Sequence, residues 1–389
     1  MPILNRAAEL QPEVTEWRRA LHTMPELLYE VHKTAAFVAE RLREFGCDEV
    51  VTGIGRTGVV GLIKGNLGAG PTLGLRADMD ALPLKEITGK PWASTHENAM
   101  HACGHDGHTA MLLGAAKYLA ETRNFAGSVA VIFQPAEEGG AGGEAMVKDG
   151  MMERFGIASV YGMHNMPGLP VGKFATRVGP LMAGTAEFTI TMKGRGGHAA
   201  MPHGTVDPIV AASALVTALQ TIVSRSTDPI EALVVSVTKF HAGDAYNIIP
   251  QQAEIAGTVR ALKKEVHELA EKRIREVSAG IAAAHGGSVD IAYDLNYPVT
   301  FNHADETAFA ISIAQGIAGA PNVTPDTPPV MGGEDFSYML EARPGAFIFI
   351  GNGDTANLHN PAYDFNDEVI PHGISYWVNL AETALAKQQ

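Results

Sequence analysis

The spacing of apolar residues changes several times along the chain. Apolar residues recur at helical spacing over residues 10–45, and Met24-Pro25-Glu26 breaks the run, which predicts two helices. Short, nearly continuous apolar runs then predict strands over 58–64, 72–78, 127–134, 158–164 and 346–351. Helical patterns predict helices over 105–123, 144–149, 305–318 and 373–387. This alternation predicts an α/β fold with a mostly parallel sheet flanked by helices.

Residues 183–297 follow a different order. Strands are predicted over 185–193, 233–240, 252–260 and 288–295, with helices over 206–224 and 264–285. Strand-helix-strand-strand-helix-strand is the split βαβ, ferredoxin-like order. We therefore predict an inserted α+β domain at 183–297 and a larger α/β domain made of 1–182 and 298–389.

Composition narrows the class of protein. A length of 389 residues favours two domains, and 46% apolar with 19% charged residues is typical of a soluble globular protein. A net charge of −14 argues against nucleic acid or an anionic membrane surface as partner. The two cysteines, Cys47 and Cys103, exclude a disulfide framework and favour a reducing compartment. We find no signal peptide and no apolar run of membrane-spanning length, so we expect a cytoplasmic protein.

Five residues of metal-binding type lie on segments expected at one edge of the parallel sheet, where such sheets bind ligands. A thiol and an imidazole flank Gly104 just before an apolar helix, and the other three follow or end predicted strands. The five candidates are Cys103, His105, Glu138, His164 and His359. Thiolate, imidazole and carboxylate together suit Zn²⁺ best, with Mn²⁺, Co²⁺ or Ni²⁺ as alternatives. Five ligands exceed the needs of one open catalytic zinc, so we expect two divalent ions that share a bridging group.

Glu137, beside Glu138, is the predicted general base. Adjacent side chains diverge in an extended or turn conformation, so one carboxylate can bind metal while the other faces a water molecule. Glu137 would accept a proton from that water and pass it to the leaving amine. Two alternatives stay open: a solvated glutamate pair without a catalytic role, and a thiol hydrolase with Cys103 as nucleophile and His105 as base.

Six segments resemble one family over essentially the whole chain. They are LRADMDALP at 75–83, MHACGHD at 100–106, QPAEE at 134–138, GMHN at 162–165, GHAAMP at 197–202 and LHNP at 358–361. The chain resembles the M20 metallopeptidases, in the subgroup of hippurate hydrolases, auxin–amino-acid conjugate hydrolases and N-acyl-amino-acid deacylases. The resemblance implies a dinuclear zinc exopeptidase-like catalytic domain. It also implies that the inserted domain acts as a lid and forms a homodimer.

The resemblance assigns further roles. It implies that the thiolate of Cys103 bridges the metals and that Asp78 is a carboxylate near the site. His198 would reach into the active site, commonly that of the partner subunit, and polarise the scissile carbonyl oxygen. Asn247 and Arg260 are candidates for substrate contact, because an arginine suits a free carboxylate. A surface salt bridge is the alternative for Arg260.

These observations predict a metal-dependent amidohydrolase. Its substrate would be an N-acyl-amino acid, hippurate-like or N-acetylated, cleaved to a carboxylic acid and a free amino acid. One alternative is a dipeptidase or aminopeptidase, which would need a pocket for a free α-amino group. Another is a metal-binding protein without catalysis, against which the presence of Glu137 argues. Residues 332–335 can form a turn that lines the pocket.

Overall fold

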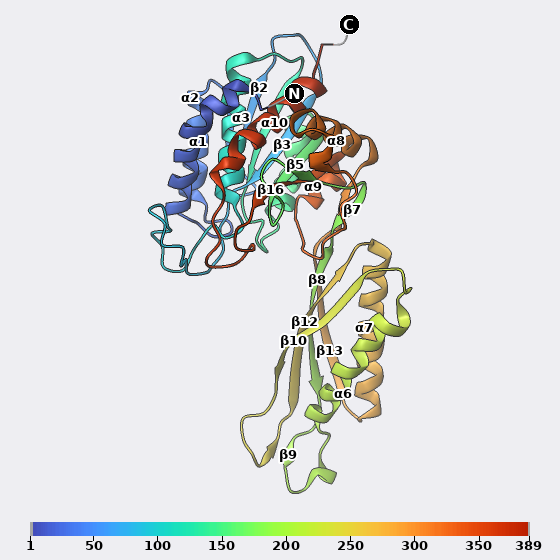
Figure 1. Ribbon diagram of the computed structural model, residues 1–389. Helices are drawn as coiled ribbons and strands as arrows, with labels where there is room; N and C mark the ends of the chain where they lie inside the picture. The colour runs from blue at the N-terminus through green and yellow to red at the C-terminus, as the bar shows by residue number, and fades with distance from the viewer. Residues whose placement is uncertain (1–2, 388–389) are drawn as a thin grey trace. The chain divides into compact units, whose positions relative to one another are not determined.

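The computed structural model describes residues 3–387, and the chain divides into two units (Figure 1). The first unit holds the residues up to Leu181, Phe301–Pro328 and the residues from Asp335 on. The second unit holds Met182–Thr300 and Pro329–Glu334. The segment 329–334, which the sequence places in the catalytic domain, thus groups with the second unit.

An eight-stranded sheet forms the centre of the first unit, in the order β1-β2-β4-β3-β5-β16-β6-β15. Strand β3 pairs in parallel with β4 and β5, and β5 pairs in parallel with β16, whereas β2 is antiparallel to both β1 and β4. The bounds are β1 (Glu49–Ile54), β2 (Gly58–Lys64), β3 (Thr72–Asp78), β4 (Ser128–Gln134), β5 (Ile157–Pro167), β6 (Phe174–Ala175), β15 (Val323–Thr324) and β16 (Gly345–Gly353). The predicted mostly parallel sheet is confirmed. The sequence did not predict β1, β6 and β15, which lie toward the two edges of the sheet.

Helices cover both faces of this sheet. Alternate strand residues such as Leu75, Val131 and Ile348 belong to one buried core with the large helices, and α1, α3 and α10 lie side by side in Figure 1. Those helices are α1 (Asn5–Thr23), α2 (His32–Glu44), α3 (His105–Thr122), α8 (Ala304–Ala318) and α10 (Ile370–Ala384). Phe347, the neighbour of Ile348, stacks instead near Phe336, just before α9. The shorter helices are α4 (Gly142–Lys148), α5 (Met151–Arg154) and α9 (Ser337–Ala342).

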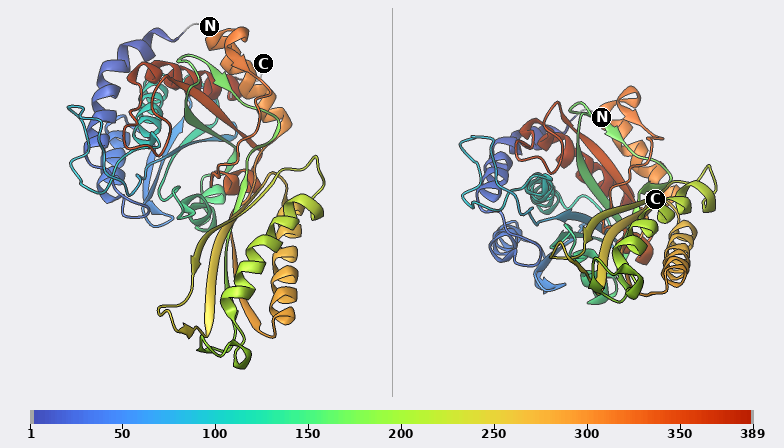
Figure 2. Two further views of the ribbon diagram at one scale, coloured as in Figure 1. Left: turned by 60° about the horizontal axis from the view of Figure 1, so that its bottom comes forward. Right: turned by 90° about the horizontal axis from the view of Figure 1, so that it is seen from below.

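The second unit is a four-stranded antiparallel sheet with two helices side by side on one face (Figure 2). The strand order is β10-β12-β8-β13, and Leu215 and Ile274 of the helices pack with Phe188 and Ile255 of the strands. The bounds are β8 (Gly184–Lys193), α6 (Pro208–Thr221), β10 (Leu233–His241), β12 (Gln252–Ala261), α7 (Lys264–Ala284) and β13 (Ser288–Tyr297). The predicted ferredoxin-like order is confirmed. Two small two-stranded sheets, β9 (Gly197–His198) with β11 (Ile248–Ile249) and β7 (Gly179–Met182) with β14 (Thr300–Asn302), were not predicted.

Helix α6 corrects one expectation from the sequence. It continues through a π-helical turn, so that Pro208–Ser226 forms a 19-residue helix long and apolar enough to cross a membrane. The expectation that no apolar run reaches this length is therefore wrong. The alanines and larger aliphatic residues of this helix keep its mean hydropathy high despite a few polar residues. One such helix is weak support for a membrane span, since core helices of soluble proteins have the same composition. Here Leu215 and Leu219 pack into the core of the second unit.

A buried ionic network ties α1 to the start of α3 and to the chain before α10. The side chain of Arg18 is fully buried, and its Nε donates to Asp367 Oδ1 at 2.8 Å. Its terminal nitrogens lie 3.5 Å from Asp106 Oδ2 and 3.5 Å from Asp364 Oδ1. Arg18 of α1 thus pairs with one carboxylate at the start of α3 and with two in the chain before α10. Each of the three carboxylates has a positively charged partner.

We predict that Arg18→Leu lowers the free energy of unfolding by about 3 kcal/mol or more, because it removes the fully buried cation that Asp106, Asp364 and Asp367 share. Urea unfolding followed by circular dichroism measures the loss. The matched control is Arg6→Leu, since Arg6 pairs with Glu121 and Glu9 but is 40% exposed. That control should cost less than about 1 kcal/mol. Equal losses in the two variants would contradict the assigned role.

His22 gives this network a pH dependence. Its Nδ1 lies 2.7 Å from Asp106 Oδ2, and its Nε2 lies 3.2 Å from Glu86 Oε2. Burial alone would lower the pKa of His22, but Asp106 and Glu86 outweigh it and raise the pKa from 6.5 to about 9. The folded chain therefore holds this proton more tightly than the unfolded chain.

We predict that the stability difference between the wild type and His22→Gln is largest below pH 6.5 and shrinks as the pH rises through 9. The reason is that a raised pKa stabilises the folded state only while the folded state binds the extra proton. Unfolding free energies of both proteins from pH 6 to 9.5 test this, and a difference independent of pH would refute it.

Candidate metal centre

The parallel register brings the ends of neighbouring strands to one edge of the sheet. Asp78, the last residue of β3, pairs with Gln134, the last residue of β4, and the glutamate pair follows three residues later. His164 lies within β5 opposite Phe349 of β16. Strand β5 runs three residues beyond its predicted end, because its pairing with β16 continues past His164.

The structure brings all five candidate ligands together. The ligand atoms of Cys103, His105 and His164 lie within 4.8 Å of one another, and so do those of Cys103, Glu138 and His359. Cys103 belongs to both groups. Two groups of three candidate ligand atoms thus adjoin and have the thiol of Cys103 in common.

Two imidazole rings are held with Nε2 facing this cluster. His105 Nδ1 lies 2.7 Å from the carbonyl oxygen of Asp80, and His164 Nδ1 lies 2.6 Å from the carbonyl oxygen of Asn165. A carbonyl oxygen only accepts, so each Nδ1 carries a proton and Nε2 is the ring nitrogen left to bind a cation. His164 Nε2 lies 3.4 Å from the sulfur of Cys103. Backbone acceptors of this kind orient metal-binding histidines.

One buried carboxylate positions the glutamate pair. Asp80 accepts the backbone N–H of Glu137 at 2.9 Å and that of Glu138 at 3.0 Å. Ala136, just before the pair, has a left-handed backbone with φ +53°. The ligand atoms of Glu137 and Glu138 lie within 4.8 Å of each other and of His105 Nε2 or Nδ1. Glu137 is thus both buried and close to the candidate ligands.

Two buried atoms of the cluster fit the coordination of a cation. Among residues 3–387, His105 Nε2 and Glu138 Oε1 have no hydrogen-bond partner. They lie 3.9 Å apart, and Glu138 Oε1 lies 3.3 Å from His359 Nε2. A buried polar atom without a partner costs free energy, which a bound ion would recover.

The charges of the cluster also fit divalent ions. Burial raises the pKa of the Cys103 thiol well above its usual value, and Glu138 and Glu137 raise it further. The adjacent carboxylate of Glu138 raises the pKa of His359. A cation bound here would compete with a proton at both groups. A thiol, imidazoles and carboxylates in this arrangement suit Zn²⁺ and similar divalent ions.

Asp78 lies beside the cluster and is held from both sides. Its Oδ1 lies 2.7 Å from His108 Nδ1, and its Oδ2 lies 2.7 Å from Arg76 Nη1 and 3.7 Å from His105 Nε2. Arg76 also donates to Asp335 Oδ1 at 3.1 Å. Asp335, whose role the sequence leaves open, is therefore a fully buried partner of Arg76.

Several residues of this region escaped the sequence analysis. Asp80 follows Asp78 by two residues and His108 follows His105 by three, which places His108 near His105 on one helix face. Those spacings could have identified Asp80 and His108 as candidate site residues. Asn165 and Tyr363, which are hydrogen-bonded across 198 positions, carry no local signal.

The second unit carries the three remaining candidates. His198 in β9 pairs with Ile248 in β11, and Asn247 accepts a backbone hydrogen bond from Ala199 at 3.0 Å, so His198 and Asn247 are exposed neighbours. Arg260 lies near the other end of the four-stranded sheet, opposite Thr185. Within one chain, the structure does not bring Arg260 to the other two.

Arg260 is half-buried rather than part of a surface salt bridge. Its guanidinium donates to Thr258 Oγ1 and, at 3.0 Å, to the carbonyl oxygen of Val259. In the described part of the chain it forms no ion pair within 4.0 Å. Burial lowers the pKa of its guanidinium. The salt-bridge alternative for Arg260 therefore finds no support.

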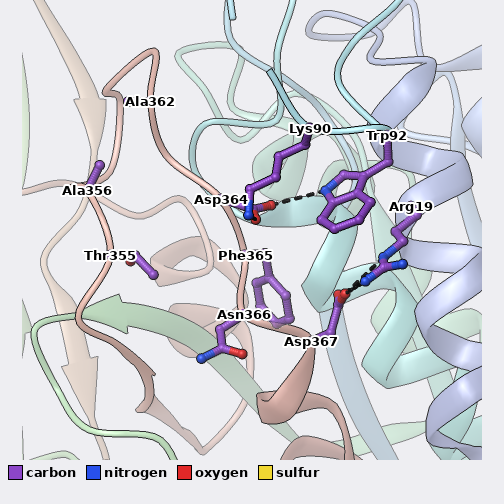
Figure 3. A pocket seen from close by; sticks show the side chains of 10 residues that line it. All are labelled: Arg19, Lys90, Trp92, Thr355, Ala356, Ala362, Asp364, Phe365, Asn366 and Asp367. Carbon is purple, nitrogen blue, oxygen red and sulfur yellow. Dashed lines mark hydrogen bonds and ion pairs between the residues drawn. The ribbon is translucent and has the colours of Figure 1, made fainter. Parts of the chain in front are cut away.

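A cavity of about 500 Å³ lies elsewhere in the first unit (Figure 3). Its lining includes none of the candidate ligands. Trp92 Nε1 donates to Asp364 Oδ1 at 3.2 Å, Lys90 lies 3.3 Å from Asp364, and Arg19 pairs with Asp367 at 2.8 Å. The charged groups drawn in Figure 3 thus pair with one another.

Comparisons with known proteins agree with this geometry. The chain matches the model of peptidase family M20/M25/M40 over residues 74–383. It is 44% identical over 382 residues to a hippurate hydrolase of Campylobacter jejuni, covering 98% of this chain and 99% of that protein. It is 40% identical over 362 residues to an N-acetyl-L-cysteine deacetylase of Bacillus subtilis, covering 93% of this chain and 85% of that protein.

A solved structure extends the likeness to the whole fold. A Bacillus subtilis protein described as a dinuclear metal binding peptidase of the M20 family superposes with a TM-score of 0.85 at 34% sequence identity. The match covers 98% of this chain and 100% of that one. On the match to the family model and the identity to full-length relatives, the chain belongs to peptidase family M20/M25/M40.

Proposed function

We propose that the chain hydrolyses the amide bond of N-acyl-amino acids at a two-metal centre, releasing a carboxylic acid and a free amino acid. The class of activity, an M20 amidohydrolase acting on linear amides, is shown by the relatives. The observation that carries the proposal is the sharing of Cys103 by two groups of three ligand atoms, with Glu137 beside them.

We propose Cys103, His105, Glu138, His164 and His359 as the metal ligands. The thiolate of Cys103 would be common to both ions, with His105 and His164 on one and Glu138 and His359 on the other, as the two groups of ligand atoms suggest. Zn²⁺ suits this donor set best, and Mn²⁺, Co²⁺ or Ni²⁺ are the alternatives. When bound, the ions supply Lewis acidity for the amide carbonyl and lower the pKa of a bound water.

Glu137 moves the proton. Asp80 fixes the backbone of the glutamate pair, so the two carboxylates keep distinct positions. The carboxylate of Glu137 accepts a proton from the attacking water and delivers it to the nitrogen of the leaving amino acid. Asp78, held by Arg76 and His108, orients the site through its position beside His105 Nε2.

The second unit supplies the substrate contacts in this proposal. His198 donates a hydrogen bond to the carbonyl oxygen of the scissile amide. It does so in the site of the partner subunit, within a homodimer formed through the inserted domain. Asn247, beside His198, is a further contact, and Arg260 would pair with the substrate carboxylate. We also propose a cytoplasmic location, consistent with two unpaired cysteines.

The substrate class follows from the relatives. Proteins named hippurate hydrolase and N-acetyl-L-cysteine deacetylase both release an amino acid from its acyl group, so an aromatic or a short acyl chain is the proposed substrate group. A dipeptidase or aminopeptidase remains the alternative within the family, and it would release amino acids from dipeptides but not from acylated amino acids.

We predict that Glu137→Gln lowers kcat for hippurate and N-acetyl-amino acids by about 10²–10⁴-fold, because it removes the proton acceptor. Metal content, measured by elemental analysis, should stay at the wild-type value, since Glu137 is not a proposed ligand. Glu30→Gln, which changes an 81% exposed glutamate, is the matched control and should keep full activity. Normal metal content with full hydrolysis in Glu137→Gln would refute the mechanism.

Removal of metal separates this reaction from thiol catalysis. We predict that dialysis against a chelator abolishes amino-acid release and that adding Zn²⁺, Mn²⁺ or Co²⁺ restores it, because no group of the chain replaces the ions. A hydrolase that used Cys103 as nucleophile would keep its activity in chelator. Stable metal binding without any hydrolysis across acylated amino acids and dipeptides would instead favour a non-catalytic metal-binding protein.

A further inference from the structure

Asn165 is a fully buried residue of β5 that the proposed reaction does not use. It follows His164 directly, and its own carbonyl oxygen accepts the hydrogen bond from His164 Nδ1 at 2.6 Å. Its side-chain Nδ2 donates to the carbonyl oxygen of Cys103 at 2.6 Å. One residue thus contacts the segments of two proposed ligands.

The neighbours of Asn165 fix the orientation of its amide. Because the carbonyl oxygen of Cys103 only accepts, Nδ2 must face it and Oδ1 must face the other way. Tyr363 donates its hydroxyl to that Oδ1 at 2.7 Å. The backbone N–H of Asn165 donates to His108 Nε2 at 2.9 Å, so His108 carries its proton on Nδ1, toward Asp78.

Tyr363 brings in a third segment of the site. It lies four residues after His359 and is fully buried, and its backbone N–H donates to the carbonyl oxygen of Asn360 at 2.9 Å. The backbone N–H of His359 donates to the carbonyl oxygen of Ala102 at 2.8 Å. The loop that holds His359 therefore contacts the Cys103 loop through Ala102, and it contacts β5 through the Tyr363–Asn165 pair.

The packing around Gly104 shows how closely this pair fits. Gly104, between Cys103 and His105, has φ +92°, and a Cβ there would lie 2.3 Å from Asn165 Nδ2 and 2.5 Å from the Tyr363 hydroxyl. The turn can approach the pair only because this residue is glycine. The position of the pair thus depends on the same turn that sets the spacing of the two ligands.

We propose that Tyr363 and Asn165 are positioning residues of the metal centre: their hydrogen-bonded pair holds the Cys103 and His359 loops and β5 in the arrangement that binds the ions. The inference rests on the proposed metal site. It differs from a role in the reaction itself, because both side chains are fully buried and hydrogen-bonded to each other. Loss of such an orienting partner typically weakens metal binding by about 10–100-fold.

The test is Tyr363→Phe, which removes one hydroxyl and keeps the ring. Two quantities are measured on full-length protein: the Co²⁺ affinity, by competition with a chromophoric chelator, and the absorption of the Co²⁺-loaded protein, including the thiolate-to-metal band. We expect affinity about 10–100-fold weaker than that of the wild type and a changed thiolate band. The control is Tyr376→Phe, because Tyr376 is also fully buried but its hydroxyl has no hydrogen-bond partner among the described residues.

The outcomes separate the two proposals. If the wild type binds no Co²⁺, the metal centre itself is wrong. If the wild type binds Co²⁺ and Tyr363→Phe matches it and Tyr376→Phe in affinity and spectrum, only the positioning role is overturned. The melting temperature of the metal-free proteins shows whether Tyr363→Phe folds; if it does not, the same measurements on Asn165→Ser, which loses the amide donor to Cys103, decide in the same way.

Discussion

The burial of ionisable groups at the carboxyl ends of parallel strands is the constraint on which the first unit depends. Asp78, Asp80 and Glu137 are buried there together with the thiol of Cys103. Burial penalises each negative charge unless a cation or hydrogen-bond donors compensate for it. Arg76 compensates for Asp78, and two backbone N–H groups compensate for Asp80. Divalent ions bound beside these groups would compensate for the negative charge that they share.

The scaffold keeps these groups in place by using costly backbone conformations. Ala136 and His359 are non-glycine residues with φ +53° and +62°, each at or beside a proposed functional side chain. Such conformations persist only where the surrounding structure fixes them, and they concentrate at functional sites. Here the rigid support is β3, β4 and β5, whose parallel pairing fixes where each loop begins. The residues with strained backbones and the buried ionisable groups thus lie at the same edge of the sheet.

The sequence predicted the long elements well because their hydrophobic patterns are strong and local. It also predicted the edge of the sheet that gathers Cys103, His105 and Glu138, since parallel strands place their carboxyl ends together. Short strands such as β6 and β15 carry too few residues for a pattern, and the true end of β5 is set by its pairing with β16 rather than by its own sequence.

What the sequence could not give is the set of contacts between distant positions. Asn165 and Tyr363 look like ordinary polar residues until the fold brings them to Cys103. Arg260 shows the converse: a residue type suited to a substrate carboxylate lies at the opposite end of its sheet from His198 within one chain. Residue type suggested a role for Arg260 and none for Asn165 or Tyr363, whereas the fold decides which side chains lie together within one chain.

The sharing of one thiolate by two ions is the central claim, and anomalous diffraction from crystals loaded with Zn²⁺ tests it most directly. Data collected at the zinc absorption edge locate each ion without reference to the ligands. We predict two peaks per chain, each about 2.3 Å from Cys103 Sγ. One peak should also contact ligand atoms of His105 and His164, and the other should contact those of Glu138 and His359. A single peak, or two peaks of which only one contacts the sulfur of Cys103, would contradict it.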